Sequence, residues 1–101
     1  PLLVGSPWID RYPLTNPDRF WKVLDTRDDI RFVAWGHIHQ PFTARRGVVQ
    51  LLGAPSTSVN SLPAREKLTP DPRGPACRWF ELDADGGFAA GVLGKGWESG
   101  V

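Results

Sequence analysis

Two histidines, His37 and His39, are the residues of this sequence best suited to chemistry. They are its only histidines, and they lie one residue apart in the run Gly36-His37-Ile38-His39-Gln40. Side chains two residues apart in extended backbone point to the same side. An extended backbone here would aim both imidazoles into one cavity, and Gly36 would permit a close approach of the backbone.

This spacing indicates a site for two metal ions. Ions about 3.5–4 Å apart, each bound by one imidazole, suit the spacing better than a single ion bound by both. Neutral imidazoles do not offset the charge of two dications, so anionic ligands are needed too. No Asp or Glu lies close in sequence to the pair. We therefore expect the carboxylates to come from elsewhere in the fold. A hydrogen-bonded loop pair without metal is the alternative that the residues alone leave open.

Length and composition predict one ordinary globular domain. The chain has 101 residues, of which 41% are hydrophobic and 23% are charged. Its net charge of +1 argues against a general attraction to nucleic acid or to an anionic membrane. No apolar stretch approaches the roughly 20 residues that a membrane span needs. The single cysteine, Cys77, excludes an internal disulfide and fits a reducing cytosol, so we expect a buried thiol and a cytoplasmic protein.

The chain contains no methionine and opens on Pro1-Leu2-Leu3-Val4. We therefore expect residues 1–101 to be the C-terminal part of a single domain whose N-terminal part is absent. The missing carboxylate ligands favour the same interpretation, because an upstream segment would supply them.

One helix is predicted after residue 15. Asn16 is a good N-cap, Pro17 fits the first turn, and Asp18 is favourable at the positive end of the helix dipole. Apolar residues follow at helical spacing, namely Phe20, Trp21, Val23 and Leu24. We expect this helix to end between residues 27 and 29.

The strands are predicted from apolar or alternating runs bounded by turn residues. These runs cover residues 30–35, 42–45, 48–52, 78–82 and 88–93. Arg46-Gly47 and the segment 83–87 indicate hairpin turns. The fold class is therefore mixed α/β, with one main helix and about five mostly antiparallel strands.

Three segments are predicted to be irregular. Pro7 and Pro13 should prevent regular structure in residues 1–15. Residues 60–76 carry four prolines and read as a long loop, of the kind that often forms a lid or a binding element. The glycine-rich tail, residues 94–101, is expected to fray.

These segments, taken in order, resemble a known enzyme family. The apolar strand, the run Gly36-His37-Ile38-His39-Gln40, the short hairpin and the run Ala54-Pro55-Ser56-Thr57-Ser58-Val59 resemble the C-terminal portion of calcineurin-like metallophosphoesterases. Within that family the chain is most similar to the bacterial 3′,5′-cyclic AMP phosphodiesterase group. Trp8-Ile9-Asp10 and the run Arg78-Trp79-Phe80-Glu81-Leu82 also match that group.

The resemblance implies a fold and a set of roles. The parent fold would be a four-layer α/β/β/α sandwich, and two divalent or mixed-valence ions of iron, manganese or zinc would be its cofactors. His37 would bind one ion and His39 the other, and His39 would also lie near the substrate phosphate. The reaction would be metal-dependent hydrolysis of a cyclic nucleotide. No catalytic acid is expected in this chain, so the general acid would lie upstream and the isolated chain would be inactive.

Two other functions share parts of this pattern. A metal-dependent DNA nuclease or a lipid pyrophosphohydrolase carries a similar histidine turn, although the near-neutral charge argues against nucleic acid as a partner. A non-enzymatic binding or structural domain with satisfied histidines is the third alternative. The partners that we expect are a phosphodiester substrate and the rest of the same domain, without a membrane.

Overall fold

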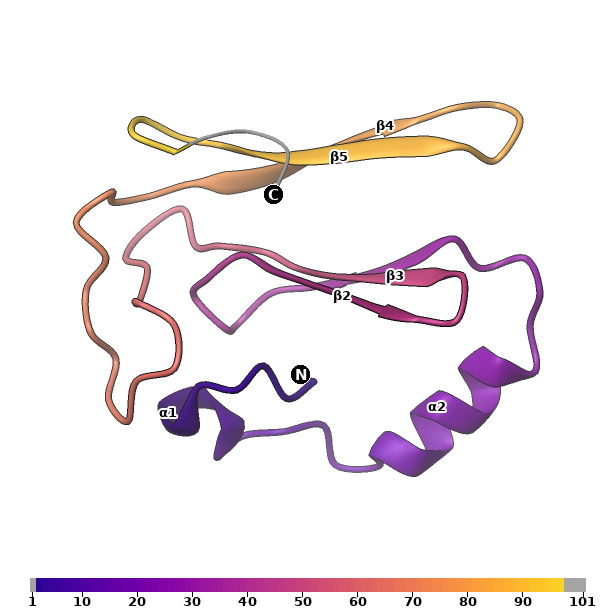
Figure 1. The fold of residues 1–101 in the computed structure, drawn as a ribbon, viewed down its shortest axis with the longest axis horizontal. Coiled ribbons are helices and arrows are strands. Elements are labelled where there is room, and N and C mark those ends of the chain that lie inside the picture. The colour runs from indigo at the N-terminus through magenta and orange to yellow at the C-terminus, as the bar shows by residue number, and fades with distance from the viewer. Residues whose placement is uncertain (1, 98–101) are drawn as a thin grey trace.

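The computed structural model describes residues 2–97, which form a mixed α/β fold with two helices and five strands. Figure 1 shows three layers: the helices on one side, a three-stranded sheet in the middle and a two-stranded hairpin on the other side. The predicted fold class is confirmed. The elements are α1 (Pro7–Asp10), α2 (Pro17–Asp25), β1 (Phe32–Trp35), β2 (Phe42–Arg46), β3 (Val49–Gly53), β4 (Cys77–Leu82) and β5 (Phe88–Leu93).

The main helix, α2, begins where the sequence predicts. Asn16 is its N-cap residue and Pro17 lies in its first turn, although the Asn16 side chain makes no capping hydrogen bond. The helix ends at Asp25, earlier than expected, because Thr26 turns the chain. The Thr26 backbone N–H and hydroxyl both donate to the Val23 carbonyl, and the hydroxyl bond measures 2.7 Å. Neither helix in residues 2–97 has the length and apolar character needed to cross a bilayer.

The prediction that residues 1–15 lack regular structure is wrong, because they include α1. Pro7 is the first residue of that helix, where a backbone N–H would have no helical partner. Proline therefore starts this turn instead of breaking it. Ile9, which is 3% exposed, anchors the turn to the rest of the molecule.

The middle layer is a sheet with strand order β1-β3-β2. β2 and β3 form the predicted hairpin, in which Gly47 takes a φ of 60° that favours glycine. β1 lies parallel to β3, with Trp35 opposite Gly53 at the last pair. β1 begins at Phe32 and not at residue 30, and its residues are half-buried except for Ala34, which is exposed.

The helix layer covers one face of this sheet. Leu24 of α2 packs with Val49 and Leu51 of β3 in a buried apolar cluster. Trp21 and Val33 pack against the same cluster, which explains the helical spacing of the apolar residues in α2.

The β4–β5 hairpin covers the other face. The Phe32 ring stacks on Phe80 with ring centroids 4.8 Å apart, and its centroid lies 4.5 Å from that of Phe88. Cys77 begins β4 and is exposed, so the prediction of a buried thiol is wrong. The reason is strand alternation, since Cys77 lies on the opposite face of β4 from Phe80, away from the sheet.

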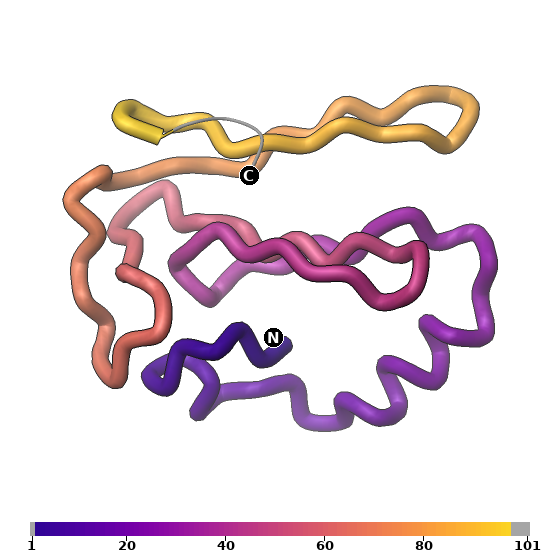
Figure 2. The backbone as a smooth tube through the Cα atoms, viewed as in Figure 1, coloured from indigo at the N-terminus to yellow at the C-terminus, as the bar shows by residue number. Residues whose placement is uncertain are grey.

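A long connection joins β3 to β4, as predicted. Figure 2 shows it running along one end of the molecule beside α1, and the Trp8 backbone N–H donates to the Arg65 carbonyl at 3.2 Å. Within the tail beyond β5, Trp97 is 8% exposed and packs with Ala76 and Val92. The remainder of the expected frayed tail, residues 98–101, lies outside the described residues.

Candidate functional site

The histidine turn, Gly36–Gln40, leaves the sheet at the carboxyl ends of its two parallel strands. β1 ends at Trp35 and β3 at Gly53, and the Ala54 N–H donates to the Trp35 carbonyl at 2.8 Å. In open α/β sheets, ligands bind outside the carboxyl ends of the parallel strands. The turn therefore lies at a favourable place for a binding site.

The backbone of this turn is not extended, so the geometry predicted from the sequence is wrong. His37 has a φ of 77° and His39 a φ of 54°, both in the left-handed region. Strand pairing stops at Trp35, and the chain reverses around Ile38, which is 0% exposed and fills the core side of the turn. Left-handed backbone at a residue other than glycine costs about 1–3 kcal/mol and clusters at functional sites.

Gly36 makes no close approach to another part of residues 2–97. A Cβ at this position would meet no atom of residues 2–97 within 4 Å. The close approach occurs instead at Gly53, where a Cβ would overlap Cδ1 of Ile38. Glycine at the end of β3, and not the glycine before the histidines, makes room for the turn.

The His39 ring is held in one orientation. Its Nδ1 lies 2.7 Å from the Val59 carbonyl oxygen, and a carbonyl can only accept a hydrogen bond. Nδ1 therefore carries the proton, which leaves the lone pair on Nε2. The Trp8 ring meets the His39 ring edge to face, with centroids 5.9 Å apart. An imidazole fixed by a carbonyl at one nitrogen and open at the other is the usual state of a metal-binding histidine.

His37 is exposed, and its ring makes no hydrogen bond to any of residues 2–97. The two histidines therefore differ: the His39 ring is oriented by a hydrogen bond, whereas the His37 ring is exposed and makes none within residues 2–97. Within residues 2–97, only His39 of the two makes a ring hydrogen bond, so the alternative of a hydrogen-bonded loop pair fits one of the two histidines.

The far end of the turn is fastened by a buried hydroxyl. Gln40 is 2% exposed, and its Oε1 accepts a hydrogen bond of 3.1 Å from Ser6, which is 0% exposed. The same Ser6 oxygen accepts a bond of 2.9 Å from the Ala64 backbone N–H. Ser6 thus links the histidine turn, the start of α1 and the long loop.

The long loop forms one wall of the site. The Ser61 N–H donates to the His39 carbonyl at 2.8 Å, so the loop contacts both the backbone and the ring of His39. Asp71 and Arg73 stabilise the loop from within by an ion pair of 2.6 Å. The Arg73 guanidinium holds the pKa of the buried Asp71 carboxyl below its usual range.

These supporting residues could not be recognised from the sequence. Val59 acts through its carbonyl, which every residue has, and Trp8 and Ser6 lie about thirty residues before the turn. Only the resemblance of Trp8-Ile9-Asp10 to a family segment marked that region. Asp10 itself accepts hydrogen bonds of 2.9 Å from the backbone N–H groups of Val4 and Gly5, so its carboxylate fixes the chain entering α1.

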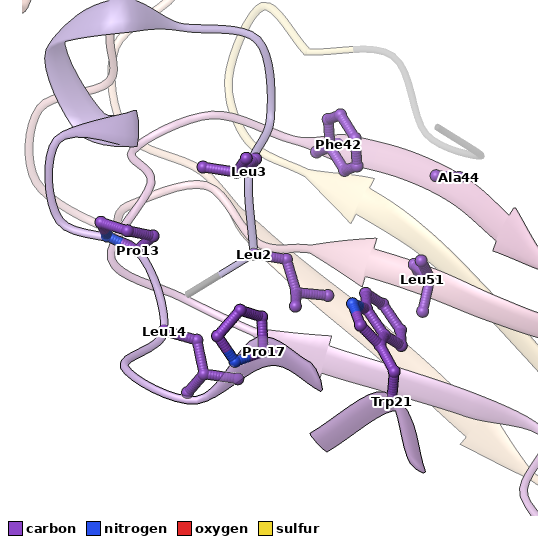
Figure 3. Close-up of a pocket in the computed structure, with 9 residues that line it drawn as sticks. All are labelled: Leu2, Leu3, Pro13, Leu14, Pro17, Trp21, Phe42, Ala44 and Leu51. Carbon is purple, nitrogen blue, oxygen red and sulfur yellow. The ribbon is translucent and has the colours of Figure 1, made fainter. Parts of the chain in front are cut away.

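The described residues do not by themselves gather a set of metal ligands. Within residues 2–97, no three or more His, Cys, Asp or Glu side chains gather where they could hold an ion. A separate groove of about 360 Å³ lies on the helix side of the sheet (Figure 3). Its lining is apolar and without titratable groups, so it is unsuited to acid–base or metal chemistry: Leu2, Leu3, Pro13, Leu14, Pro17, Trp21, Phe42, Ala44 and Leu51.

Comparison with known proteins gives relatives of one kind. The chain is 38% identical over 92 residues to the 3′,5′-cyclic adenosine monophosphate phosphodiesterase CpdA of Pseudomonas aeruginosa, covering 91% of this chain and 34% of that protein. It is 37% identical over 86 residues to a 3′,5′-cyclic-nucleotide phosphodiesterase of Nostoc, covering 85% of this chain and 32% of the relative. CpdA of Escherichia coli K12 is 35% identical over 86 residues, with 85% and 31% covered.

No protein-family model and no solved structure matches the chain. The chain spans about a third of the length of the curated relatives that it matches. Most of its own residues are aligned in each comparison, including the region of the histidine turn and its supporting loop. The chain is thus a homologue of the bacterial 3′,5′-cyclic nucleotide phosphodiesterases, matching about one third of each.

Proposed function

We propose that the protein to which this chain belongs hydrolyses the phosphodiester of 3′,5′-cyclic nucleotides, cyclic AMP among them, in a metal-dependent reaction. The single observation that carries the proposal is the His39 ring, whose Nδ1 is bonded to the Val59 carbonyl and whose Nε2 is left with its lone pair. The printed names of the relatives support the substrate class.

The residues present fit a share of a two-ion site. His37 and His39 would each hold one ion, and the strained backbone at both residues supports a functional constraint. Two bound ions of iron, manganese or zinc would supply Lewis-acid activation of water and neutralise charge on the phosphate. His39 would also contact the substrate phosphate. Carboxylate ligands and the general acid would come from other parts of the protein, so we expect residues 1–101 alone to be inactive.

A four-layer α/β/β/α sandwich belongs to the same proposal. The described residues supply three layers (Figure 1), and the face of the β4–β5 hairpin turned away from the sheet carries Cys77, Trp79, Glu81 and Leu93. Trp79 is 36% and Leu93 is 62% exposed on that face. A further helical layer would cover these exposed apolar side chains. A cytoplasmic location also belongs to the proposal, since a lone exposed cysteine suits a reducing compartment.

The test uses the full-length protein and two variants, His37→Ala and His39→Ala. We expect each variant to lose at least about a hundredfold in the rate of cyclic AMP hydrolysis. Each should also bind less metal, because removing one imidazole donor weakens the binding of one ion. Arg45→Ala, at an exposed position of β2, is the control and should keep full activity. Undiminished metal-dependent hydrolysis in both histidine variants would remove the proposal.

The substrate class is tested on the same protein. Cyclic AMP, single-stranded DNA and a bis-phosphodiester lipid analogue are assayed side by side. Preference for DNA or for the lipid analogue would favour the nuclease or the pyrophosphohydrolase instead. Turnover by purified residues 1–101 would contradict the expected inactivity of the isolated chain.

A further inference from the structure

Asn60 is a buried residue next to Val59, and the proposed function assigns it no role. It is 0% exposed, and its amide uses its acceptor and both donors. Oδ1 accepts a hydrogen bond of 2.6 Å from the Ser56 N–H, and Nδ2 donates at 2.9 Å to the carbonyls of Ser56 and Gly74. Of the uncharged side chains, only an amide offers an acceptor and two donors on one planar group.

These bonds fix the backbone on both sides of Val59. Ser56 lies three residues before Val59, so the Asn60 side chain closes the turn that contains it. The Asn60 carbonyl then accepts the N–H of Asp71 at 2.7 Å, which ties the turn across the loop. The Asn60 side chain therefore holds the Val59 peptide unit in place, and the Val59 side chain makes no hydrogen bond that could do so.

The direction of the Val59 carbonyl decides where the proton of His39 resides. A free imidazole in water exchanges between two tautomers, and a carbonyl 2.7 Å from Nδ1 selects the one with its proton on Nδ1. No side-chain substitution removes a backbone carbonyl. A substitution can change this bond only at a residue that orients the Val59 peptide, and Asn60 is next to Val59 in the sequence.

We propose that Asn60 is a positioning residue that holds the Val59 carbonyl on Nδ1 of His39 and so keeps Nε2 available for metal. The effect on the tautomer stands on the structure alone, whereas the effect on metal binding rests on the proposed function. Outer-shell partners of metal-binding histidines typically change metal affinity 10- to 100-fold when they are removed.

The chain offers a matched control in Trp97. Its Nε1 donates to the same Gly74 carbonyl as Asn60, at 3.2 Å, and the residue is also buried. Trp97→Phe removes that bond and loosens the same loop at its far end. It leaves the bonds between Asn60 and Ser56 in place, so Val59 should keep its position.

The experiment compares wild-type full-length protein with Asn60→Ala and Trp97→Phe. Nitrogen-15 NMR of the metal-free proteins reports the tautomer of His39, and titration with Mn²⁺ reports metal affinity. We expect the wild type and Trp97→Phe to show the single Nδ1-protonated form. Asn60→Ala should show a mixture of tautomers and an Mn²⁺ affinity lower by about 10- to 100-fold, whereas that of Trp97→Phe stays within about twofold.

Each outcome decides the proposal. If Asn60→Ala keeps a pure Nδ1-protonated His39, or binds Mn²⁺ as Trp97→Phe does, Asn60 is only a structural residue of the loop. If Asn60→Ala does not fold, Asn60→Ser retains one acceptor for the Ser56 N–H and should show an intermediate effect. Failure of the proposed function is recognised separately, because His39→Ala would then leave Mn²⁺ affinity unchanged while the NMR result still tests the tautomer.

Discussion

The guanidinium of Arg78 joins the two β layers through the carbonyl of Gly53. Nε of Arg78 lies 3.2 Å and Nη2 3.1 Å from that oxygen, and Nη2 also lies 3.5 Å from the Phe42 carbonyl. Arg78 belongs to β4, whereas Gly53 ends β3 beside the histidine turn. Burial lowers the pKa of the Arg78 guanidinium, so these bonds to carbonyl oxygens offset part of the cost of taking a charge out of water.

Arg78→Lys should loosen the hairpin from the sheet. A lysine ammonium is a point donor and lacks the planar fork that reaches both carbonyls. We expect a loss of about 1–3 kcal/mol in the free energy of unfolding. Hydrogen exchange of the β4–β5 amides should also become faster, measured by mass spectrometry. Arg45→Lys, on exposed β2, should change neither quantity. Unchanged exchange in Arg78→Lys would show that other contacts hold the hairpin.

Gly53→Ala should disturb the histidine turn from its buried side. The added Cβ would overlap Cδ1 of the buried Ile38 and lie 3.1 Å from Cβ of Phe42. Overpacking of this kind typically costs about 1–3 kcal/mol. Because Ile38 lies between the two histidines, we expect hydrolysis of cyclic AMP by the full-length protein to fall together with stability.

The control for Gly53→Ala is Gly91→Ala. A Cβ at Gly91 would lie 2.7 Å from ring atoms of Trp79, on the face of the hairpin away from the sheet. Its stability should also fall, but its activity at a temperature where both variants are folded should match the wild type. Equal losses of activity in both variants would show that the Gly53 effect is general destabilisation.

Acid should destabilise the protein partly through Asp71. The carboxyl is buried, accepts hydrogen bonds from the backbone and side chain of Arg73, and has a lowered pKa in the folded state. In the unfolded chain its pKa returns to about 3.9. The unfolded state therefore binds the proton first, so this stabilisation is complete well above pH 4 and is lost as pH falls through the folded pKa.

Asp71→Asn should consequently be less stable than the wild type near neutral pH and should show a shallower loss of stability below about pH 5. Urea unfolding at a series of pH values measures both. Asp29→Asn is the control, because Asp29 and its partner Arg27 are each 59% exposed and such surface pairs add little. Parallel pH profiles for Asp71→Asn and the wild type would contradict the assignment.

The parts of the fold that could be predicted from sequence are those with local causes. The start of α2 follows from Asn16 and Pro17, and the first hairpin follows from Gly47, whose φ of 60° the turn requires. These signals act within a few residues, so no knowledge of the rest of the molecule is needed. The strand ends and the end of α2 were less accurate, because contacts such as that of Thr26 with Val23 decide them.

The geometry of the candidate site could not be predicted in the same way. The spacing of His37 and His39 suggests extended backbone, but their conformation follows from Ile38 entering a space left by Gly53, fifteen residues later. The proton position on His39 depends on Val59, twenty residues later. The residue types in the sequence do not reveal either contact. The type and order of the residues predicted the histidine pair, whereas distant packing determines how each ring is presented.

Ser6 and Gln40 provide a last test, of the link between the histidine turn and the long loop. Ser6→Ala leaves the buried Oε1 of Gln40 unpaired and also removes the acceptor of the Ala64 backbone N–H. An unpaired buried group costs about 1–3 kcal/mol, so this change should lower stability clearly although it removes a single oxygen. Gln40→Met leaves the Ser6 hydroxyl without its acceptor but keeps the volume of the side chain.

The double variant should be more stable than the sum of the two single changes predicts, since it removes both members of the Ser6–Gln40 bond. A coupling of about 0.5–3 kcal/mol is expected for residues in direct contact. Chemical denaturation of the four proteins measures this coupling, and hydrogen exchange at Ala64 reports the second bond. Strict additivity would mean that Ser6 and Gln40 do not interact in solution, and the turn would then be anchored by Ile38 and the His39 contacts alone.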